Sequence, residues 1–198
     1  MNFELKKFRI DCEVLHWKQR TYLISDIAHI FYSRLNIQKR TNFVKTGSAT
    51  KVWLDISLDN GEKIELAITD NPIFLGLIGD HFDEVMKLNE IYAYLAKATF
   101  KKRSSNYHLQ IQKKGCFDYG GCVFYPPDKI VCGDKEFKLA ETDLLRGAGY
   151  VELRKKEYGL LDKMKREIPF IKIPRFDTQT DHDVIFALLH VHFGLHWE

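Results

Sequence analysis

The stretch KVWLDISLDNGEKIELAI, residues 51–68, decides how the first part of the chain folds. Apolar residues alternate with other residues on both sides of Asp59-Asn60-Gly61, which is the period of a half-buried β-strand. The alternating residues are Val52, Leu54, Ile56 and Leu58 before the turn, and Ile64, Leu66 and Ile68 after it. Asn-Gly between two such runs is a strong hairpin signal, because both central residues must tolerate positive φ. The stretch therefore predicts a β-hairpin.

The segments that flank this hairpin differ in period. Before it, residues 22–32 are mostly β-branched, aromatic or aliphatic, which indicates strands. After it, from Pro72 to about Arg103, apolar residues recur every three or four positions, which predicts one or two amphipathic helices. Ser104-Ser105-Asn106 then has the composition of a turn-forming linker, and it is the best candidate for a domain boundary.

Strand patterns return after this candidate linker. Short apolar runs begin at Leu109 and Ile111, and a second hairpin is predicted around Gly133-Asp134. Further strands are expected near residues 150–153 and 170–173. A closing helix is expected from Thr180 to about Phe193, where Thr180 and Asp183 resemble a capping box.

The composition is that of an ordinary folded protein. The chain has 198 residues, of which 45% are hydrophobic, 13% aromatic and 29% charged, and this excludes a disordered chain. The net charge of +3 is too small to mark a dedicated nucleic-acid binder. No apolar run reaches the roughly 18 residues of a membrane span, and the start has no apolar signal-peptide core. A soluble cytoplasmic protein with four reduced cysteines is therefore expected.

Parts of the two halves of the chain can be laid over one another. Residues 22–26 (YLISD) match residues 137–141 (FKLAE), and the two predicted closing helices overlay without a gap. In that overlay Glu90 falls on Asp183 and Phe100 falls on Phe193. Both matches occur in the same order within halves of about 100 residues, which indicates a duplicated domain.

A module of about 100 residues with successive antiparallel strands and one closing helix resembles the pleckstrin-homology (PH-like) barrel. The run from Arg20 to Ile27, followed by Ile30, is similar to the strand-and-corner segment of bacterial PH-like domains. The hairpin at residues 59–61 and the helix expected over residues 89–103 match the same pattern. The resemblance implies a β-rich α+β chain with two PH-like antiparallel barrels, at residues 1–103 and 104–198, each closed by a C-terminal helix. The alternative is a single α+β domain with one mixed sheet.

The sequence contains no established catalytic motif. It lacks a P-loop, a dinucleotide fingerprint, a nucleophile elbow and a zincin helix, so no catalytic residue and no cofactor are predicted. Cys116, Cys122 and Cys132 have no Cys-x-x-Cys spacing, which favours structural thiols. His192 and His196 are four apart and would share a helix face, but Gly194 is expected to end the helix between them. No metal site is therefore predicted there.

The most uneven charge lies between Arg34 and Lys51, where no acidic residue occurs. The basic residues of this segment are Arg34, Lys39, Arg40, Lys45 and Lys51, and residues 42–50 read as a mobile polar loop. One interpretation is an anion-binding segment for a lipid headgroup or nucleic-acid phosphates. The other is a solvated hairpin whose charges protect a strand edge.

These observations lead to a non-enzymatic interaction or scaffold module as the main functional hypothesis. Such a module would bind a protein partner through loops or strand edges, and a homo-oligomer fits the same edges. One alternative is binding of an anionic membrane surface or nucleic acid through residues 34–51. Another is a metal- or thiol-dependent enzyme that uses Cys116, Cys122 or the histidines of residues 190–196.

Overall fold

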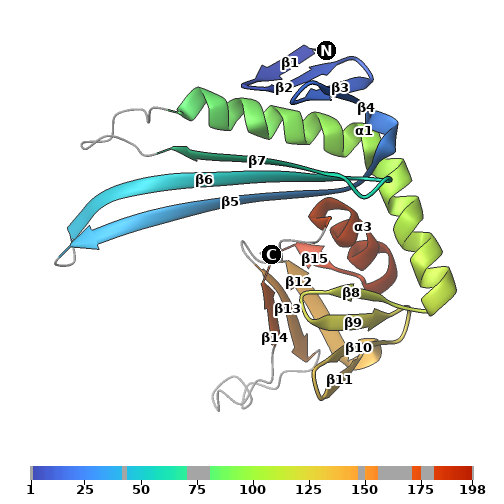
Figure 1. Cartoon of the computed structure of the whole chain (residues 1–198). Coiled ribbons are helices and arrows are strands. Elements are labelled where there is room, and N and C mark those ends of the chain that lie inside the picture. Colours follow the sequence, from blue (N-terminus) through green and yellow to red (C-terminus); the bar gives the residue numbers. More distant parts are fainter. Residues whose placement is uncertain are drawn as a thin grey trace. The chain divides into compact units, whose positions relative to one another are not determined.

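The chain divides into two compact units, Met1–Arg103 (unit 1) and Ser104–Glu198 (unit 2). The computed structural model describes residues 2–41, 44–70, 81–146, 150–155, 171–174 and 181–197. Its described residues form several antiparallel sheets and two helices, so the chain belongs to the β-rich α+β class (Figure 1).

Unit 1 begins with a four-stranded antiparallel sheet in the order β1-β2-β3-β4. A short 3-10 helix, η1, leads into a three-stranded sheet in the order β5-β6-β7. The elements are β1 (Asn2–Leu5), β2 (Phe8–Asp11), β3 (Val14–Trp17), β4 (Arg20–Leu23), η1 (Ile24–Asp26), β5 (Ile27–Thr41), β6 (Val44–Leu58) and β7 (Lys63–Asp70).

The predicted hairpin at residues 59–61 is confirmed as the β6–β7 connection. The turn closes through hydrogen bonds of 2.9 Å from Gly61 N–H to the Leu58 carbonyl and from Leu58 N–H to the Glu62 carbonyl. Gly61 has φ 84°, while Asn60 accepts a side-chain hydrogen bond from Glu62 N–H at 2.9 Å. The connection is therefore the three-residue type with one left-handed glycine, in place of the two-residue turn that the Asn-Gly pair predicts.

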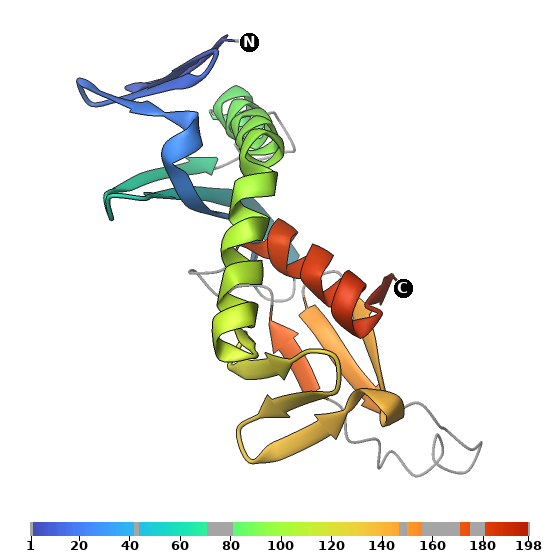
Figure 2. The same ribbon diagram turned by 90° about the vertical axis from the view of Figure 1, so that its right-hand side faces the viewer.

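The core of unit 1 lies among its two sheets and the first part of helix α1 (Phe82–Lys114). Figures 1 and 2 show this part of the helix running beside both sheets. Leu88, Ile91 and Leu95 are fully buried, because residues spaced three and four apart share one helix face. Lys102 links the helix to η1 and to the β6–β7 turn. Its Nζ donates hydrogen bonds of 2.5 Å to the Ser25 carbonyl and to Asp59.

Within the described residues, unit 2 has the same element order as unit 1, followed by one more short strand. A sheet in the order β11-β10-β9-β8 is followed by the 3-10 helix η2 and by a sheet in the order β14-β13-β12-β15, in which β15 pairs with β12 in parallel. The elements are β8 (Phe117–Tyr119), β9 (Cys122–Tyr125), β10 (Lys129–Cys132), β11 (Lys135–Lys138), η2 (Leu139–Glu141), β12 (Thr142–Arg146), β13 (Tyr150–Lys155), β14 (Ile171–Pro174), α3 (His182–Phe193) and β15 (His196–Trp197).

Equivalent hydrogen bonds link equivalent positions of the two units. Ile24, the first residue of η1, donates to the Glu13 carbonyl at 2.9 Å, and Leu139, the first residue of η2, donates to the Asp128 carbonyl at 2.8 Å. The shift in residue number from Ile24 to Leu139 equals the shift from Glu13 to Asp128. The sequence overlay of residues 22–26 on 137–141 has the same shift. The units thus share a local connection between the fourth strand and the second sheet.

The overlay of the two helices does not align their first residues, which differ from it by about two turns. It places Asn89 on His182, whereas the helices begin at Phe82 and His182. Ring contacts between the helix and the first strand of each unit indicate a similar shift. Phe3 contacts Tyr94 in unit 1, and Phe117 contacts Phe193 in unit 2. A shift of seven residues is nearly two full turns and preserves the apolar face, so periodicity alone does not detect it.

The predicted barrels are not observed, because no strand pairing closes a sheet within the described ranges and the strands form four separate open sheets. This also differs from the alternative of one mixed sheet. The linker predicted at residues 104–106 and the strand predicted at Leu109 and Ile111 are wrong, because α1 continues to Lys114. Serine and asparagine within a long helix give a misleading turn signal when their neighbours keep the helical spacing.

Two further expectations fall on the strand hairpin and the last helix. The predicted polar loop at residues 42–50 is wrong from Val44 onward, where β6 already pairs with β5. Residues 42 and 43 lie outside the described residues. The predicted closing helix is confirmed as α3, with Asp181 as N-cap and no side-chain cap hydrogen bond, whereas Thr180 lies outside the described residues.

The expectation of four free thiols is wrong, since Cys122 and Cys132 form a disulfide within unit 2. The two cysteines are direct cross-strand partners in β9 and β10, with Cα atoms 4.2 Å apart. The equivalent pair in unit 1 is Phe8 and Trp17, whose rings make an edge contact at 6.2 Å. In the described part of the chain no helix is long and apolar enough to cross a membrane.

Candidate functional site

The first hairpin of unit 1 is attached to the start of helix α1 by charge. Lys6 in the β1–β2 turn places its Nζ 3.2 Å from Glu84 Oε2, and His81 Nδ1 lies 3.4 Å from the same oxygen. These contacts are partly exposed, so each contributes little to the free energy of folding. Their main effect is to position the hairpin turn. They hold the turn of the hairpin over the first turn of the helix.

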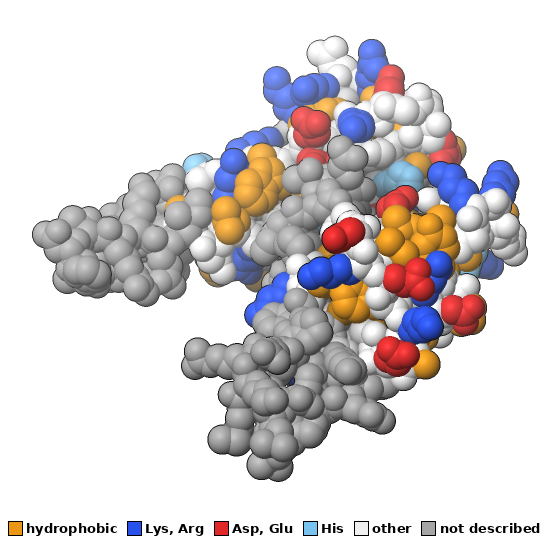
Figure 3. All heavy atoms as spheres, turned by 90° about the horizontal axis from the view of Figure 1, so that it is seen from below, with side chains coloured by type: hydrophobic (Ala, Val, Ile, Leu, Met, Phe, Trp, Pro, Cys, Tyr) orange, Lys and Arg blue, Asp and Glu red, His pale blue; other side chains and the backbone are white. Residues whose placement is uncertain are grey.

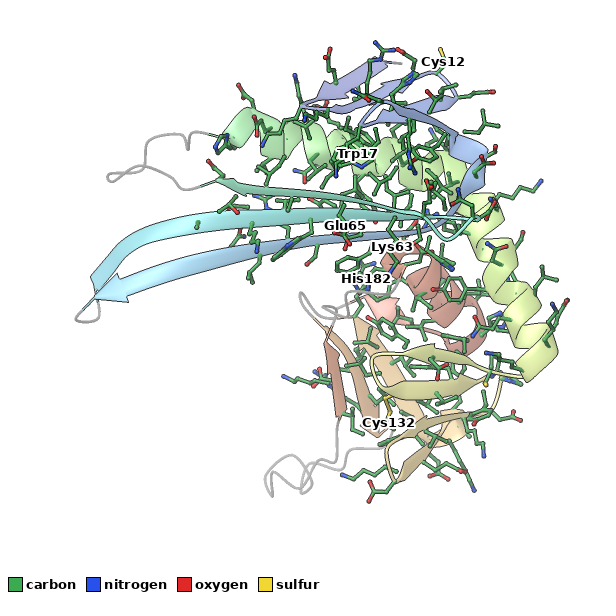
Figure 4. All side chains as sticks on the ribbon, viewed as in Figure 1. Cys12, Trp17, Lys63, Glu65, Cys132 and His182 are labelled. Atoms are coloured by element: carbon green, nitrogen blue, oxygen red, sulfur yellow. A yellow bond between two sulfur atoms is a disulfide. The ribbon has the colours of Figure 1, made fainter. Side chains whose placement is uncertain are left out.

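Tyr94 makes a second attachment further along the helix. Its hydroxyl donates to the Cys12 carbonyl at 2.7 Å, and its ring lies 5.5 Å from the ring of Phe3. Figure 4 shows Cys12 at one end of the first sheet and Trp17 pointing toward the helix. The backbone of the β2–β3 turn and the Phe3 side chain of β1 both contact Tyr94, so the first sheet is attached to this part of the helix.

A groove of about 940 Å³ lies between β1 and α1. Its lining residues are Phe3, Glu90, Ala93, Tyr94, Lys97 and Ala98. The helical members recur at intervals of three and four, so they lie on one helix face. The groove exists because Ala93 and Ala98 carry only a methyl group where a longer side chain would fill the space.

The walls of the groove are apolar and its two ends are charged. Glu90 and Lys97 are both exposed and lie seven residues apart, which is about 10.5 Å along a helix. One end of the groove is therefore acidic and the other basic. This arrangement distinguishes the direction of a bound chain and favours a ligand with separated charges of both signs.

One side of the groove is an open strand edge. Among the described residues β1 pairs only with β2, with Phe3 opposite Ile10 and Leu5 opposite Phe8. Every second residue of such an edge directs its backbone N–H and C=O away from the sheet, where another strand can pair. The groove thus combines hydrogen-bonding backbone with apolar side-chain space.

Sequence reasoning identified the helix but none of the groove residues. The available signal was the pair Ala93 and Ala98, two small residues on the polar face of a helix with charges on both sides. This signal has no meaning until a neighbouring strand is known, and the sequence does not reveal that β1 lies beside that face.

The structure separates two of the five basic residues predicted to bind anions. Arg34 is exposed on β5 and pairs with Val52, whereas Lys51 pairs with Leu35, and successive pairs face opposite sides of a sheet. Lys51 places its Nζ 4.7 Å from the centre of the Trp53 ring. Arg34 and Lys51 therefore do not contribute to one common surface.

The other three basic residues have a described backbone only. Lys39 and Arg40 lie in β5, Lys45 lies in β6, and Arg40 pairs with Lys45. Their side chains lie outside the described residues. On the face that Figure 3 presents, basic and acidic side chains are interspersed among the described atoms. Anion binding by residues 34–51 stays a prediction.

A pair of carboxylates lies on the second sheet of unit 1. Asp55 on β6 is the direct cross-strand partner of Glu65 on β7, and Figure 4 shows Glu65 and Lys63 on the same side of that strand. Burial raises the pKa of Asp55 above its ordinary value, the Glu65 charge raises it further, and Lys63 opposes them. The ionised Asp55 is thus a small cost to folding at neutral pH.

Asp55→Asn is expected to raise the stability of unit 1 at pH 7 by at most about 1 kcal/mol, because the pair stays partly exposed. A raised pKa means that the folded state binds the proton first, so wild-type stability increases as pH falls from the raised pKa toward the ordinary value of 3.8. The advantage of the variant should therefore shrink between pH 7 and pH 4 in urea titrations. Ser57→Ala, on the same strand face, is the control, and an equal advantage at both pH values would contradict the prediction.

The helix ends between His192 and His196, as the sequence predicts, so the two histidines do not share a helix face. α3 ends at Phe193, and Gly194 adopts the left-handed conformation at φ 63°, so His196 lies in β15 and is no longer on the helix with His192. His192 instead approaches His108 of α1, with ring centres 5.8 Å apart. The free cysteines are Cys12, which is exposed, and Cys116, which is half-buried. No group of three or more metal-ligating side chains occurs in the described ranges.

Comparisons with family models, curated proteins and solved structures give no significant match to this chain.

Proposed function

We propose that the chain is a non-enzymatic protein-interaction module that binds an extended segment of a partner protein in the β1–α1 groove. The observation that carries this proposal is the open edge of β1 beside an apolar groove with charged ends. An added strand would pair with β1 through its backbone, while its alternate side chains enter the space above Ala93 and Ala98. Strand addition of this kind combines backbone affinity with side-chain selectivity.

We also propose that each unit is a PH-like module. This is supported by the repeated order of four strands, a 3-10 helix, three strands and a helix. The hydrogen bonds from Ile24 to Glu13 and from Leu139 to Asp128 support it as well. A PH-like fold would suggest binding or scaffolding, but only by analogy with other proteins of that fold. The specific proposal of peptide binding therefore rests on the groove.

The charges at the ends of the groove define the bound segment. An extended chain advances about 3.3 Å per residue, so residues four apart span about 13 Å and reach Glu90 and Lys97 with flexible side chains. The residue midway between them faces the groove. The favoured pattern is therefore a basic residue, then an aromatic residue two positions on, then an acidic residue after two more.

The test uses the labelled peptide Thr-Lys-Thr-Phe-Thr-Glu-Thr and measures fluorescence anisotropy. Ala93→Trp, which fills the groove, is expected to weaken binding at least 10-fold, while Ala67→Trp on an exposed position of β7 leaves it unchanged. Lys97→Glu should weaken this peptide about 5- to 10-fold and should strengthen binding of the variant peptide with Lys in place of Glu.

Two results would contradict the proposal. One is a peptide affinity no greater than that of an all-threonine control. The other is equal loss in Ala93→Trp and Ala67→Trp, because the effect would then be independent of the groove.

A further inference from the structure

Two histidines from different helices meet within unit 2. His108 lies in the part of α1 that belongs to unit 2, and His192 lies in the last turn of α3. Their ring centres are 5.8 Å apart and the ring planes are inclined by 68°. His108 is exposed and His192 is half-buried, so the pair has one ring in contact with solvent.

The spacing of the rings matches that of two imidazoles on one metal ion. A zinc–nitrogen bond is about 2.0–2.1 Å long, which places each ring centre roughly 3.2 Å from the ion. Two such rings at a tetrahedral angle have centres about 5.2 Å apart, and a wider angle increases this distance. The observed 5.8 Å is close to this spacing.

His192 has a nitrogen that lacks an interaction. Its Nε2 atom is buried, and the described residues offer it no hydrogen-bond partner. A buried polar atom without a partner is costly, so such an atom in a native protein calls for an explanation. Burial, with a smaller effect from His108, lowers the pKa of His192, which keeps the ring neutral and able to bind an ion at neutral pH.

We propose that His108 and His192 form a binding site for a divalent transition-metal ion such as Zn²⁺ or Ni²⁺. Imidazole nitrogen suits these ions, whereas Mg²⁺ and Ca²⁺ prefer oxygen ligands. No third ligating side chain joins the pair among the described residues, so water completes the coordination. The site is therefore open and weaker than a structural zinc site with four protein ligands.

Binding at this site would connect α1 to α3. The two ligands come from different helices, so the ion binds the folded unit more tightly than the unfolded chain. At a free ion concentration of ten times Kd, the folding equilibrium constant of unit 2 should rise about 11-fold. The ion thus acts as a reversible cross-link that strengthens the attachment of the last helix.

The experiment measures thermal and urea unfolding of the full chain, without a histidine tag, after treatment with EDTA and then with added NiCl₂. Nickel is chosen because zinc would also bind the thiols of Cys12 and Cys116. The unfolding free energy of the wild type should rise with the logarithm of the nickel concentration above Kd, and isothermal titration should give a stoichiometry near one. His108→Ala, which replaces an exposed side chain and leaves the fold intact, should lose the gain, as should His192→Gln.

His190→Ala is the matched control on α3, since the Nδ1 of His190 lies 3.0 Å from the Leu195 carbonyl and His190 is not one of the two proposed ligands. It should keep the nickel response. No nickel response in the wild type would overturn the proposal, and so would an equal response in His108→Ala.

Discussion

Phe124→Ala is expected to destabilise unit 2 by about 3–5 kcal/mol, the range for removing a buried aromatic side chain. Phe124 is fully buried at the centre of the core of unit 2. Its ring stacks on Phe117 at 5.2 Å and meets the edge of Phe193 at 5.3 Å, so one residue joins β8, β9 and α3. Truncation leaves a cavity against all three elements. Urea unfolding followed by circular dichroism measures the loss.

Two variants separate this effect from general damage. Phe124→Leu keeps most of the volume and should cost less than half as much as alanine. Phe100→Ala, at a position that is 38% exposed, should stay within about 1 kcal/mol of the wild type. If Phe124→Ala and Phe100→Ala cost the same, the ring cluster of unit 2 is not the core that its contacts indicate.

Loss of the Cys122–Cys132 disulfide is expected to cost about 3 kcal/mol of unfolding free energy in unit 2. The cysteines are separated by 10 positions along the chain. In the chain-entropy model, a cross-link of that length constrains the unfolded state by about 2.8 kcal/mol. The change is made as Cys122→Ala with Cys132→Ala, and the same loss should follow when wild type is unfolded in the presence of a reductant.

The free cysteine Cys12 provides the control. Cys12→Ala lies in unit 1 and keeps the disulfide, so reductant should destabilise this variant as much as it destabilises the wild type. Thiol titration under denaturing conditions should find two reactive thiols in the oxidised wild type. A titration that finds four, together with identical curves with and without reductant, would contradict the disulfide.

The sequence was most informative where the structure depends on local chemistry. Alternation around Gly61 places Val52, Leu54 and Ile64 on the buried side of the β6–β7 hairpin, as predicted. The alternation of apolar residues in a strand and the choice of turn residues depend on a few neighbouring residues. They can therefore be recognised without knowledge of the rest of the chain. The sequence was misleading at residues 104–106, where local turn composition competes with a helix of 33 residues.

The candidate sites depend on distances between residues that are far apart in the sequence, and local sequence patterns do not specify these distances. Cys122 meets Cys132 because β9 and β10 pair in one register, and a different register would separate them. His192 meets His108 because α3 packs against the second half of α1. The groove likewise requires β1 to lie beside Ala93 and Ala98.

The β-rich α+β class, the hairpins and the helical faces could be read from the sequence alone. Each of these is a property of nearby residues, because backbone conformation and amphipathic period are local. The three-dimensional structure was needed to show where α1 ends, how far the helix starts of the two units differ, which cysteines pair, and which strand edge borders a groove. These depend on the packing of residues that are distant in the chain, and side-chain periodicity does not specify which partners meet.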